Sequence, residues 1–370
     1  MNNPLRKVAM LAAGLLTAAT AFADDGRGDD RDSARPLTLA VFGDWPYNQN
    51  LLANAGLLID SVNSDPRVRF VVHVGDIHSG SMPCTSAGIL PPLATSVPGW
   101  NQAIYYQFQQ FRAPMIYTPG DNEWTDCHKS KEQASGDPLK ELASVRSLFF
   151  AKPGVTLGRN ERAVRTQARD YDRSYPADAQ FVENVVWDEA RVVFVTLNVP
   201  GSNNDTLLWT GAYSNPVAQQ KEVAERTAAD IRWLDAAFHE AEEDHARAVV
   251  VILQADMWDP AALVPGGDGL SAYQSLVQEL ANLTEHFARP VLLLNGDSHL
   301  YETDHPLADP TSSTGSIYHT QAVPNLTRIT VQGSTNAPAE WLRLTIDPWS
   351  ATPFVWQNVP YCANPLGSCQ

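Results

Sequence analysis

The chain has 370 residues, of which 44% are hydrophobic, and its formal net charge is −16. This length is enough for one large hydrophobic core or for two modest ones. Such an acidic surface argues against nucleic acid and anionic membranes as partners, and it would also repel a phosphate-bearing substrate unless bound cations reversed the charge locally.

The first 23 residues have the features of a signal peptide. Arg6 and Lys7 supply the positive start of an apolar stretch, 8–22, and a small-x-small cleavage site follows at 21–23. The apolar stretch is too short to span a bilayer comfortably, and no later segment of the sequence approaches that length. We therefore expect an exported protein, periplasmic or secreted, with no membrane span and with a disordered acidic leader at 24–36.

Hydrophobic runs and periodicities then predict strands and helices in alternation. Strands are expected at 37–42, 69–74, 114–118, 183–187, 191–199, 246–253, 290–294, 326–331, 341–346 and 354–359, with 183–187 and 191–199 forming a hairpin. Helices are expected at 50–64, 101–112, 138–150, 220–245 and 273–287. The segments 79–100, 151–180 and 201–216 are expected to be loops or irregular. The alternation, closed by strands alone, predicts one α/β domain.

The four cysteines indicate two disulfides in an exported chain. Cys362 and Cys369 are close in sequence and are expected to close a small loop in the C-terminal tail, 361–370. This leaves Cys84 to pair with Cys127. A zinc site is the alternative, but the spacings include no paired C-x-x-C.

Four predicted strands end in the same dipeptide, Gly-Asp. These dipeptides are Gly43-Asp44, Gly75-Asp76, Gly120-Asp121 and Gly296-Asp297. Each by itself is more typical of a turn than of a ligand site. Together they lie at the carboxyl ends of strands, where α/β sheets gather their ligands, and they therefore indicate a shared site. Glycine before each aspartate is expected to let the backbone turn sharply and approach an ion.

The chemistry of these strand ends favours metal binding. The candidate ligands are Asp44, Asp76, Asp121, Asn122, Asp297 and His299, with Gln254 or Asp256 from a fifth strand end. Carboxylates that meet at one rim repel each other unless cations neutralise them, and one carboxylate can bridge two cations. Two ions roughly 3.5–4 Å apart are a common device for phosphoryl transfer. The sequence therefore predicts a site for two divalent metal ions.

The order of the motifs resembles the calcineurin-like metallophosphoesterase superfamily, which includes the purple acid phosphatases. An Asp, a Gly-Asp, the block Gly120-Asp121-Asn122-Glu123, a strand-end Gln254 and the block 296–299 follow one another as in that family. The resemblance covers roughly residues 37–347, and the helix with Arg232-Trp233-Leu234 fits the same layout. It implies a two-sheet β-sandwich flanked by helices, in an α-β-β-α arrangement over 37–360, with a dinuclear metal centre at one rim.

The resemblance also assigns roles to the candidate ligands, position by position. Asp44 matches the first-motif Asp, and Asp76 matches the Asp that bridges the two ions. Asp121 falls on a metal-binding Asn of the family, with Asn122 as the alternative ligand if the alignment shifts locally. Gln254 falls on a His of the family. Asp297 and His299 fall on the two residues of Gly-His-x-His.

Several positions depart from the family pattern. The family usually has a His two residues after the first Asp, but this chain has Pro46 at that position. Purple acid phosphatases also lack that His. Those enzymes supply a Tyr three residues after the second-motif Asp, where this chain has Ser79. Tyr47 or His78 could fill that gap, although neither aligns.

The departures at the second ion replace nitrogen ligands by the oxygens of Gln254 and Asp297, which favours a harder ion there. The ions themselves could be Mn, Mg, Ca, Fe or Zn. Asn122 takes the place of a His that helps to stabilise substrate or to protonate the leaving group. His78 and His128 are candidate substitutes for this general acid, because a near-neutral pKa suits proton donation.

The family resemblance implies hydrolysis of a small phosphate-ester substrate by a water held between two ions. The alternative is a degenerate member of the family that binds a metal or a ligand without hydrolysis, because several family histidines are missing. Two further residue groups have expected supporting roles. His73, inside an apolar strand, is expected to be a hydrogen-bonded core or supporting residue, and 201–205 could contact substrate from the rim.

Overall fold

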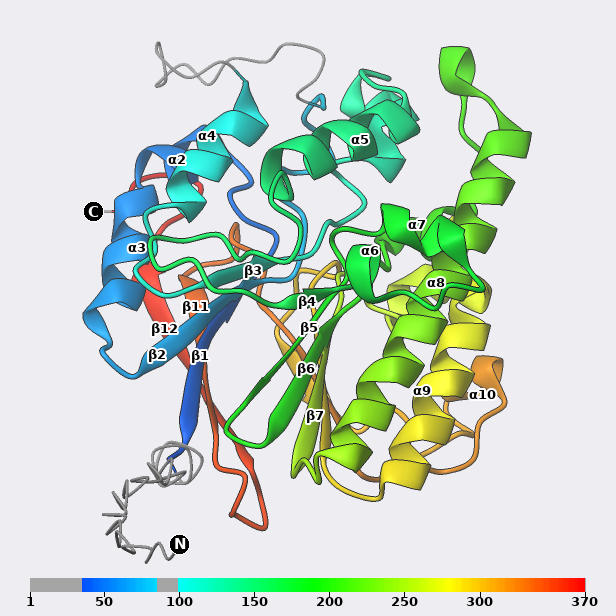
Figure 1. Cartoon of the computed structure of the whole chain (residues 1–370). Coiled ribbons are helices and arrows are strands. Elements are labelled where there is room, and N and C mark those ends of the chain that lie inside the picture. Colours follow the sequence, from blue (N-terminus) through cyan, green and yellow to red (C-terminus); the bar gives the residue numbers. More distant parts are fainter. Residues whose placement is uncertain (1–34, 85–98, 370) are drawn as a thin grey trace, which may run out of the picture.

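Two β-sheets lie face to face in the computed structural model, which describes residues 35–84 and 99–369 (Figure 1). Helices cover the outer face of each sheet (Figure 1). The chain is therefore a mixed α/β protein with two multi-stranded sheets flanked by helices. The predicted signal peptide, nearly all of the predicted leader and most of the predicted loop 79–100 lie outside the described residues.

The first sheet has five strands in the order β12-β11-β1-β2-β3. These are β1 (Leu37–Phe42), β2 (Val68–His73), β3 (Met115–Tyr117), β11 (Ala339–Ile346) and β12 (Phe354–Cys362). Strands β1, β2 and β3 are parallel, while β11 and β12 are antiparallel additions at the β1 edge. The parallel strands are apolar nearly throughout, as expected for strands buried on both faces.

The second sheet has seven strands in the order β4-β5-β6-β7-β8-β10-β9. These are β4 (Arg165–Thr166), β5 (Val185–Glu189), β6 (Val192–Thr196), β7 (Ala248–Ile252), β8 (Val291–Asn295), β9 (Glu302–Asp304) and β10 (Leu326–Thr330). Strands β6, β7, β8 and β10 are parallel. The predicted hairpin is confirmed as β5 and β6, which pair antiparallel across a turn where Ala190 and Arg191 have positive φ.

The long helices agree with the predicted ones except near residue 54. They are α2 (Gln49–Ala53), α3 (Ala55–Ser64), α4 (Trp100–Phe108), α5 (Pro138–Phe149), α8 (Pro216–Glu243) and α9 (Gln274–Phe287). The predicted single helix 50–64 is wrong, because Asn54 separates α2 from α3. The backbone of Asn54 leaves the helical region, and both its backbone N–H and its side-chain amide donate to the carbonyl of Asn50, which ends α2.

Short elements lie between the longer helices and strands, and some of them fall in the segments expected to be irregular. They are α6 (Gln167–Asp170), α7 (Gly201–Asp205), α10 (Gly315–Tyr318) and the 3-10 helices η2 (Thr125–His128), η3 (Ser130–Glu132), η4 (Pro176–Gln180), η5 (Gly211–Tyr213), η6 (Pro260–Leu263) and η7 (Ser271–Tyr273). The expectation of loop structure at 201–216 is therefore wrong for its first residues. The element α7 is unusual, because Ser202, Asn203 and Asn204 all have left-handed backbone angles.

Three apolar clusters hold the layers together. One lies between the two sheets and joins Leu39 and Val72 of the first sheet to Val250 and Leu292 of the second. Another packs α8 and α9 on the seven-stranded sheet, and the third packs α3, α4 and α5 on the five-stranded sheet. This packing fixes the two sets of parallel strands so that their carboxyl ends open on the same edge.

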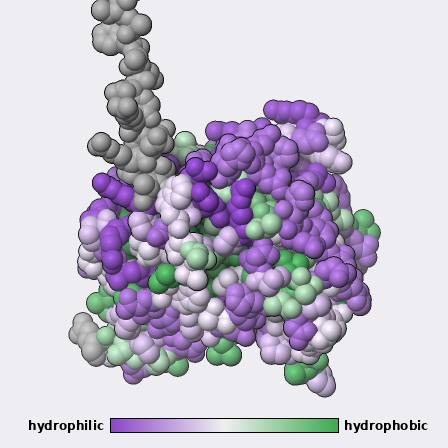
Figure 2. Space-filling view, turned by 90° about the horizontal axis from the view of Figure 1, so that it is seen from below, coloured by the Kyte–Doolittle hydropathy of each residue, from purple (hydrophilic) through white to green (hydrophobic). Residues whose placement is uncertain are grey.

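Both predicted disulfides, Cys84–Cys127 and Cys362–Cys369, are present, as expected for an exported protein. Within the described part of the chain, no helix has both the length and the apolar character needed to cross a bilayer. Figure 2 shows the molecule from below, at the end opposite to the carboxyl ends of β1 and β6. On this face, hydrophobic residues form scattered small groups among hydrophilic ones.

Candidate metal centre

The four Gly-Asp strand ends converge, as expected. Asp44 follows β1, Asp76 follows β2, Asp121 follows β3, and Asp297 follows β8. Backbone hydrogen bonds tie the ends of β1 and β2 together, from the amide of Asp44 to the carbonyl of Gly75 at 2.9 Å. A similar bond joins the ends of β7 and β8.

Three of the four aspartates themselves make the sharp turns after the strands. The φ angles are 48° at Asp44, 62° at Asp76 and 75° at Asp297, and His299 has a φ of 64°. A residue other than glycine with such a left-handed backbone conformation costs about 1 kcal/mol or more of folding free energy. Four costly conformations among the predicted ligands indicate that the side chains are aimed by the surrounding fold toward a functional site.

The main role of the glycines before the aspartates is to let neighbouring carboxylates come close to the backbone, not to make the sharp turn. Of the four that precede an aspartate, only Gly75 has a positive φ, 101°, so the expectation of a glycine-made turn is wrong for the other three. A Cβ on Gly120 would lie 2.1 Å from Oδ1 of Asp76, and one on Gly296 would lie 2.7 Å from Oδ2 of Asp44. A side chain at either position would therefore push into the carboxylates.

Two overlapping sets of side chains have the geometry of metal sites. The first group is Asp44, Asp76 and His299, and the second group is Asp76, Asp121 and Asp297. Within each group the ligand atoms lie within 4.8 Å of one another. Asp76 belongs to both groups, which is the arrangement required of a bridging carboxylate.

The carboxylates of these groups are destabilised as anions in the absence of a cation. Burial raises the pKa of Asp44 and of Asp121, and raises that of Asp76 and Asp297 well above its usual range. Repulsion adds to burial, because Asp121 faces both Asp76 and Asp297. Oδ2 of Asp44 is buried and has no hydrogen-bond partner among the described residues, so its lone pairs are free for an ion.

The two predicted amide ligands lie in the site but present their nitrogens to the carboxylates. Nε2 of Gln254 lies 3.3 Å from Oδ2 of Asp76 and 3.1 Å from Oδ1 of Asp121, while its Oε1 accepts from the amide of Gly201 at 2.5 Å. Nδ2 of Asn122 donates to Oδ2 of Asp76 at 3.0 Å and to the carbonyl of His78 at 3.1 Å. These partners orient both amides as donors that hold Asp76.

Tyr47, which the alignment could not place, occupies the centre of the first group. Its hydroxyl lies 2.8 Å from Oδ2 of Asp76, 3.0 Å from Oδ1 of Asp44 and 3.0 Å from Nε2 of His299. Burial and the two carboxylates raise the pKa of Tyr47 well above its usual value, so the hydroxyl is a donor. The sequence signal was its position three residues after Asp44, close to the strand end.

The turn α7 reaches the second group from the side. A Cβ on Gly201 would lie 2.7 Å from Oδ1 of Asp297 and 2.9 Å from Oδ2 of Asp121, so only glycine fits there. The hydroxyl of Ser202 donates to Oδ2 of Asp121 at 2.8 Å and also lies 2.7 Å from Oδ1 of Asp126. The sequence offered this segment only as a weak rim candidate, because nothing in it signals a left-handed turn.

The histidines proposed as the general acid are not brought to the carboxylates. Burial lowers the pKa of His78 to about 4, and its Nε2 is buried. His128 is buried as well, with a lowered pKa, and its Nδ1 accepts from the amide of Thr210. His73 has the expected supporting role, because Nε2 contacts the carbonyl of Trp45 and Nδ1 accepts from the amide of Gly75.

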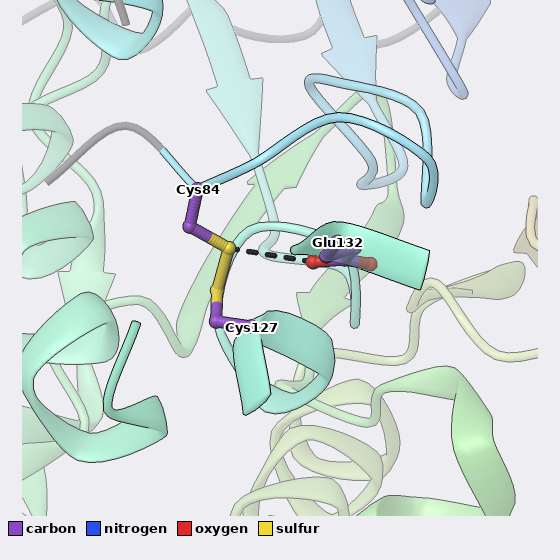
Figure 3. Close-up of side chains that lie close together, drawn as sticks. All are labelled: Cys84, Cys127 and Glu132. Carbon is purple, nitrogen blue, oxygen red and sulfur yellow. Dashed lines mark hydrogen bonds between the residues drawn. A yellow bond between two sulfur atoms is a disulfide. The ribbon is translucent and has the colours of Figure 1, made fainter. Parts of the chain in front are cut away.

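Two more predicted or possible ligand positions have structural partners. Asp256 forms an ion pair with the buried Arg328, and its amide donates to Oδ2 of Asp297 at 3.0 Å, so it supports Asp297. Cys84 and Cys127 lie next to the buried Glu132 (Figure 3). Because both sulfurs are in the disulfide, they are not thiolates and cannot serve as zinc ligands there.

A cavity of about 730 Å³ opens over both groups. Its lining includes Tyr47, Asp76, Asp121, Asn122, Asp297 and His299. Most of the candidate ligands, though not Asp44 or Gln254, therefore face a space large enough for a small molecule. Neither His78 nor His128 is among its lining residues.

Comparison with known proteins leaves the family open. No family model matches the chain, and no curated protein matches it. Among solved structures, it is similar to the one described as "GAP50 the anchor in the inner membrane complex of Plasmodium", with 10% identity and a TM-score of 0.40, over 89% of this chain and 90% of that one. A likeness this distant carries no argument about this protein.

Proposed function

We propose that this protein is an exported, metal-dependent phosphoesterase of the calcineurin-like metallophosphoesterase superfamily, with residues 37–360 as its catalytic domain in the α-β-β-α architecture. The observation that carries the proposal is the convergence of four Gly-Asp strand ends on two carboxylate groups that share Asp76. The order of the motifs along the chain supports the same family.

The donor atoms suit divalent cations. Oδ2 of Asp44 is buried without a partner among the described residues, and burial raises the pKa of Asp44 and Asp76, so positive charge in the site would favour their ionised forms. The first group would hold one ion with two carboxylates and His299. The second group has carboxylates only, which favours Mg, Mn or Ca over Zn.

Two divalent ions, when bound, would supply positive charge for the phosphoryl oxygens and activate water as the nucleophile. The side chains of this protein would then hold the arrangement in place. Tyr47 and Asn122 donate to Asp76, Gln254 spans Asp76 and Asp121, and Ser202 donates to Asp121. These bonds keep the shared carboxylate oriented between the two groups.

Protonation of the leaving group is the step with the least support from this chain. His299 is the sole histidine among the described residues that line the cavity, and its Nε2 is turned to Tyr47 and Asp44. Without a dedicated acid, esters with good leaving groups should react best. Aryl phosphates are therefore the suitable test substrates.

A second candidate function is metal or ligand binding without hydrolysis. It is favoured by the amides of Gln254 and Asn122, which donate hydrogen bonds to Asp76. Relatives in the superfamily have imidazoles at both positions. An amide that already satisfies a carboxylate reduces the need for a second ion at the second group.

The test is an activity assay of the purified full chain with an aryl phosphate monoester and a bis-aryl diester, each with Mn, Mg, Ca or Zn. Hydrolysis with at least one metal is expected, and Asp76→Asn should lower kcat/KM about 10²–10³-fold. Asp235→Asn, an exposed aspartate on α8, is the matched control and should retain full activity. Metal analysis should find Mg, Mn or Ca in the second group.

A folded protein that is inactive with every metal but still binds Mn would favour the second candidate function. Tight stoichiometric zinc in both groups would contradict the assignment of a harder ion to the second group.

A further inference from the structure

The cavity over the two carboxylate groups is strongly acidic, but one lysine also lines it. Its lining includes six aspartates: Asp76, Asp121, Asp256, Asp259, Asp268 and Asp297. Lys131 is the sole lysine or arginine among the described residues of that lining. Its side chain is 50% exposed, so the ammonium group is accessible from the cavity.

Lys131 belongs to a segment that is fixed to the core. It lies in η3, and the next residue, Glu132, is buried with Oε2 3.4 Å from Sγ of Cys84 in the disulfide (Figure 3). The amide of Gly136 donates to the carbonyl of Cys127, which closes the segment. A lysine on such a fixed backbone loses less conformational freedom when it binds a ligand.

Lys131 shares a buried carboxylate with a second lysine. Nζ of Lys131 lies 2.9 Å from Oδ2 of Asp126, whereas Oδ1 of the same carboxylate lies 2.7 Å from Nζ of Lys129. Asp126 is buried, so two ammonium groups share one carboxylate in a poorly solvated position. Lys129 also lies 3.9 Å from the half-exposed Asp268. The two lysines together carry one more charge than the buried Asp126 that they share.

Lys131 also lies next to the candidate metal centre. A Cβ on Gly80 would be 3.0 Å from Nζ of Lys131 and 2.6 Å from Oδ1 of Asn122, so these two atoms flank the same point over Gly80. Nδ2 of Asn122 is in turn 3.0 Å from the shared carboxylate of Asp76. Only glycine at position 80 leaves this space open.

We propose that Lys131 binds a non-bridging oxygen of the substrate's phosphoryl group and gives the site a preference for dianionic phosphate monoesters over monoanionic diesters. This proposal rests on the proposed function. The four aspartates of the two groups and two divalent ions would together be neutral. Lys129 and Lys131 share the single carboxylate of Asp126, so this cluster adds one net positive charge for a dianion. An ammonium group interacts more strongly with the additional charge of the monoester.

The test compares Lys131→Met with Lys131→Arg and with the matched control Lys140→Met, whose side chain is 83% exposed on α5. Asp126 remains paired with Lys129 in the Lys131 variants, so folding should be preserved. In the manganese-loaded full chain, Lys131→Met should raise the Kd for orthophosphate, measured by calorimetry, about tenfold. It should raise KM for the aryl monoester similarly, with little change in kcat and a smaller change for the diester.

Lys131→Arg should restore most of the orthophosphate affinity, and Lys140→Met should match the wild type. Unchanged orthophosphate binding in Lys131→Met, or an equal loss for monoester and diester, would overturn the role of Lys131. If the wild type binds orthophosphate through Lys131 but hydrolyses neither ester, the anion site stands while the phosphoesterase function falls. If the wild type binds no orthophosphate at all, the inference about Lys131 is overturned.

Discussion

The first and second groups share Asp76 but differ in how their remaining oxygens are satisfied. In the first group, Oδ2 of Asp44 is buried without a partner among the described residues, and the single proton of the Tyr47 hydroxyl is shared between Asp44 and Asp76. In the second group, Asp121 accepts from Gln254 and Ser202, and Asp297 accepts from the amide of Asp256. The first group therefore depends more on a cation, whereas hydrogen bonds from the protein already replace part of the cation's effect in the second.

The largest expected effect is the change in pH dependence when metal is removed. In the metal-free protein, burial holds the pKa values of Asp44, Asp76, Asp121 and Asp297 above those of the unfolded chain. These carboxyls contribute their full stability to the folded state at pH values below 3.8, their pKa in the unfolded chain. This contribution is lost as the pH rises toward their higher pKa values in the folded protein. Each carboxyl that must ionise should cost about 1.4 kcal/mol per pH unit.

Urea unfolding at pH 5 to 8, with chelator or with Mn, measures this effect. The chelated protein should lose stability as pH rises, and Mn should remove that loss, because a bound cation favours the ionised carboxylates. Buried acids elsewhere, such as Asp230, affect both samples alike, so the difference isolates the two groups. Asp297→Asn should flatten the chelated slope, whereas Asp235→Asn should not. Equal slopes with and without Mn would contradict a metal site.

A smaller effect separates the two groups directly. Asp44→Asn removes a ligand from the first group and Asp121→Asn removes one from the second, while each leaves the other group's ligands intact. Calorimetric titration with Mn should show that each variant has lost about 10–100-fold in the affinity of one metal-binding site. The weakened site should be a different one in each variant. If both variants weaken the same single site, the chain holds one ion, and the comparison of two groups is wrong.

The sequence predicted the elements of this centre better than their roles. Continuous apolar runs that end in Gly-Asp identified β1, β2, β3 and β8, because strand ends are encoded locally. The direction in which Gln254 presents its amide depends on the backbone of Gly201, which is 53 residues away in sequence. The turn at 201–205 and the position of Lys131 depend likewise on tertiary contacts, so no local pattern could reveal them.

The smallest expected effect tests whether hydrogen bonds substitute for a cation in the second group. Gln254→Leu leaves the amide of Gly201 without its acceptor and removes the donor between Asp76 and Asp121. The chelated protein should lose about 1–3 kcal/mol in its free energy of unfolding. Tyr47→Phe removes one hydroxyl from the first group, and its cost should be about 0.5–1.5 kcal/mol.

Urea unfolding of both variants, chelated and Mn-loaded, distinguishes the two groups. If Gln254 substitutes for an ion, its loss should cost more in the chelated protein than in the loaded one, because bound Mn then neutralises Asp76 and Asp121 directly. Gln220→Leu, an exposed glutamine on α8, controls for the change of side chain and should behave as the wild type. An equal cost with and without Mn would mean that Gln254 only anchors α7, and that both carboxylate groups depend on cations to the same degree.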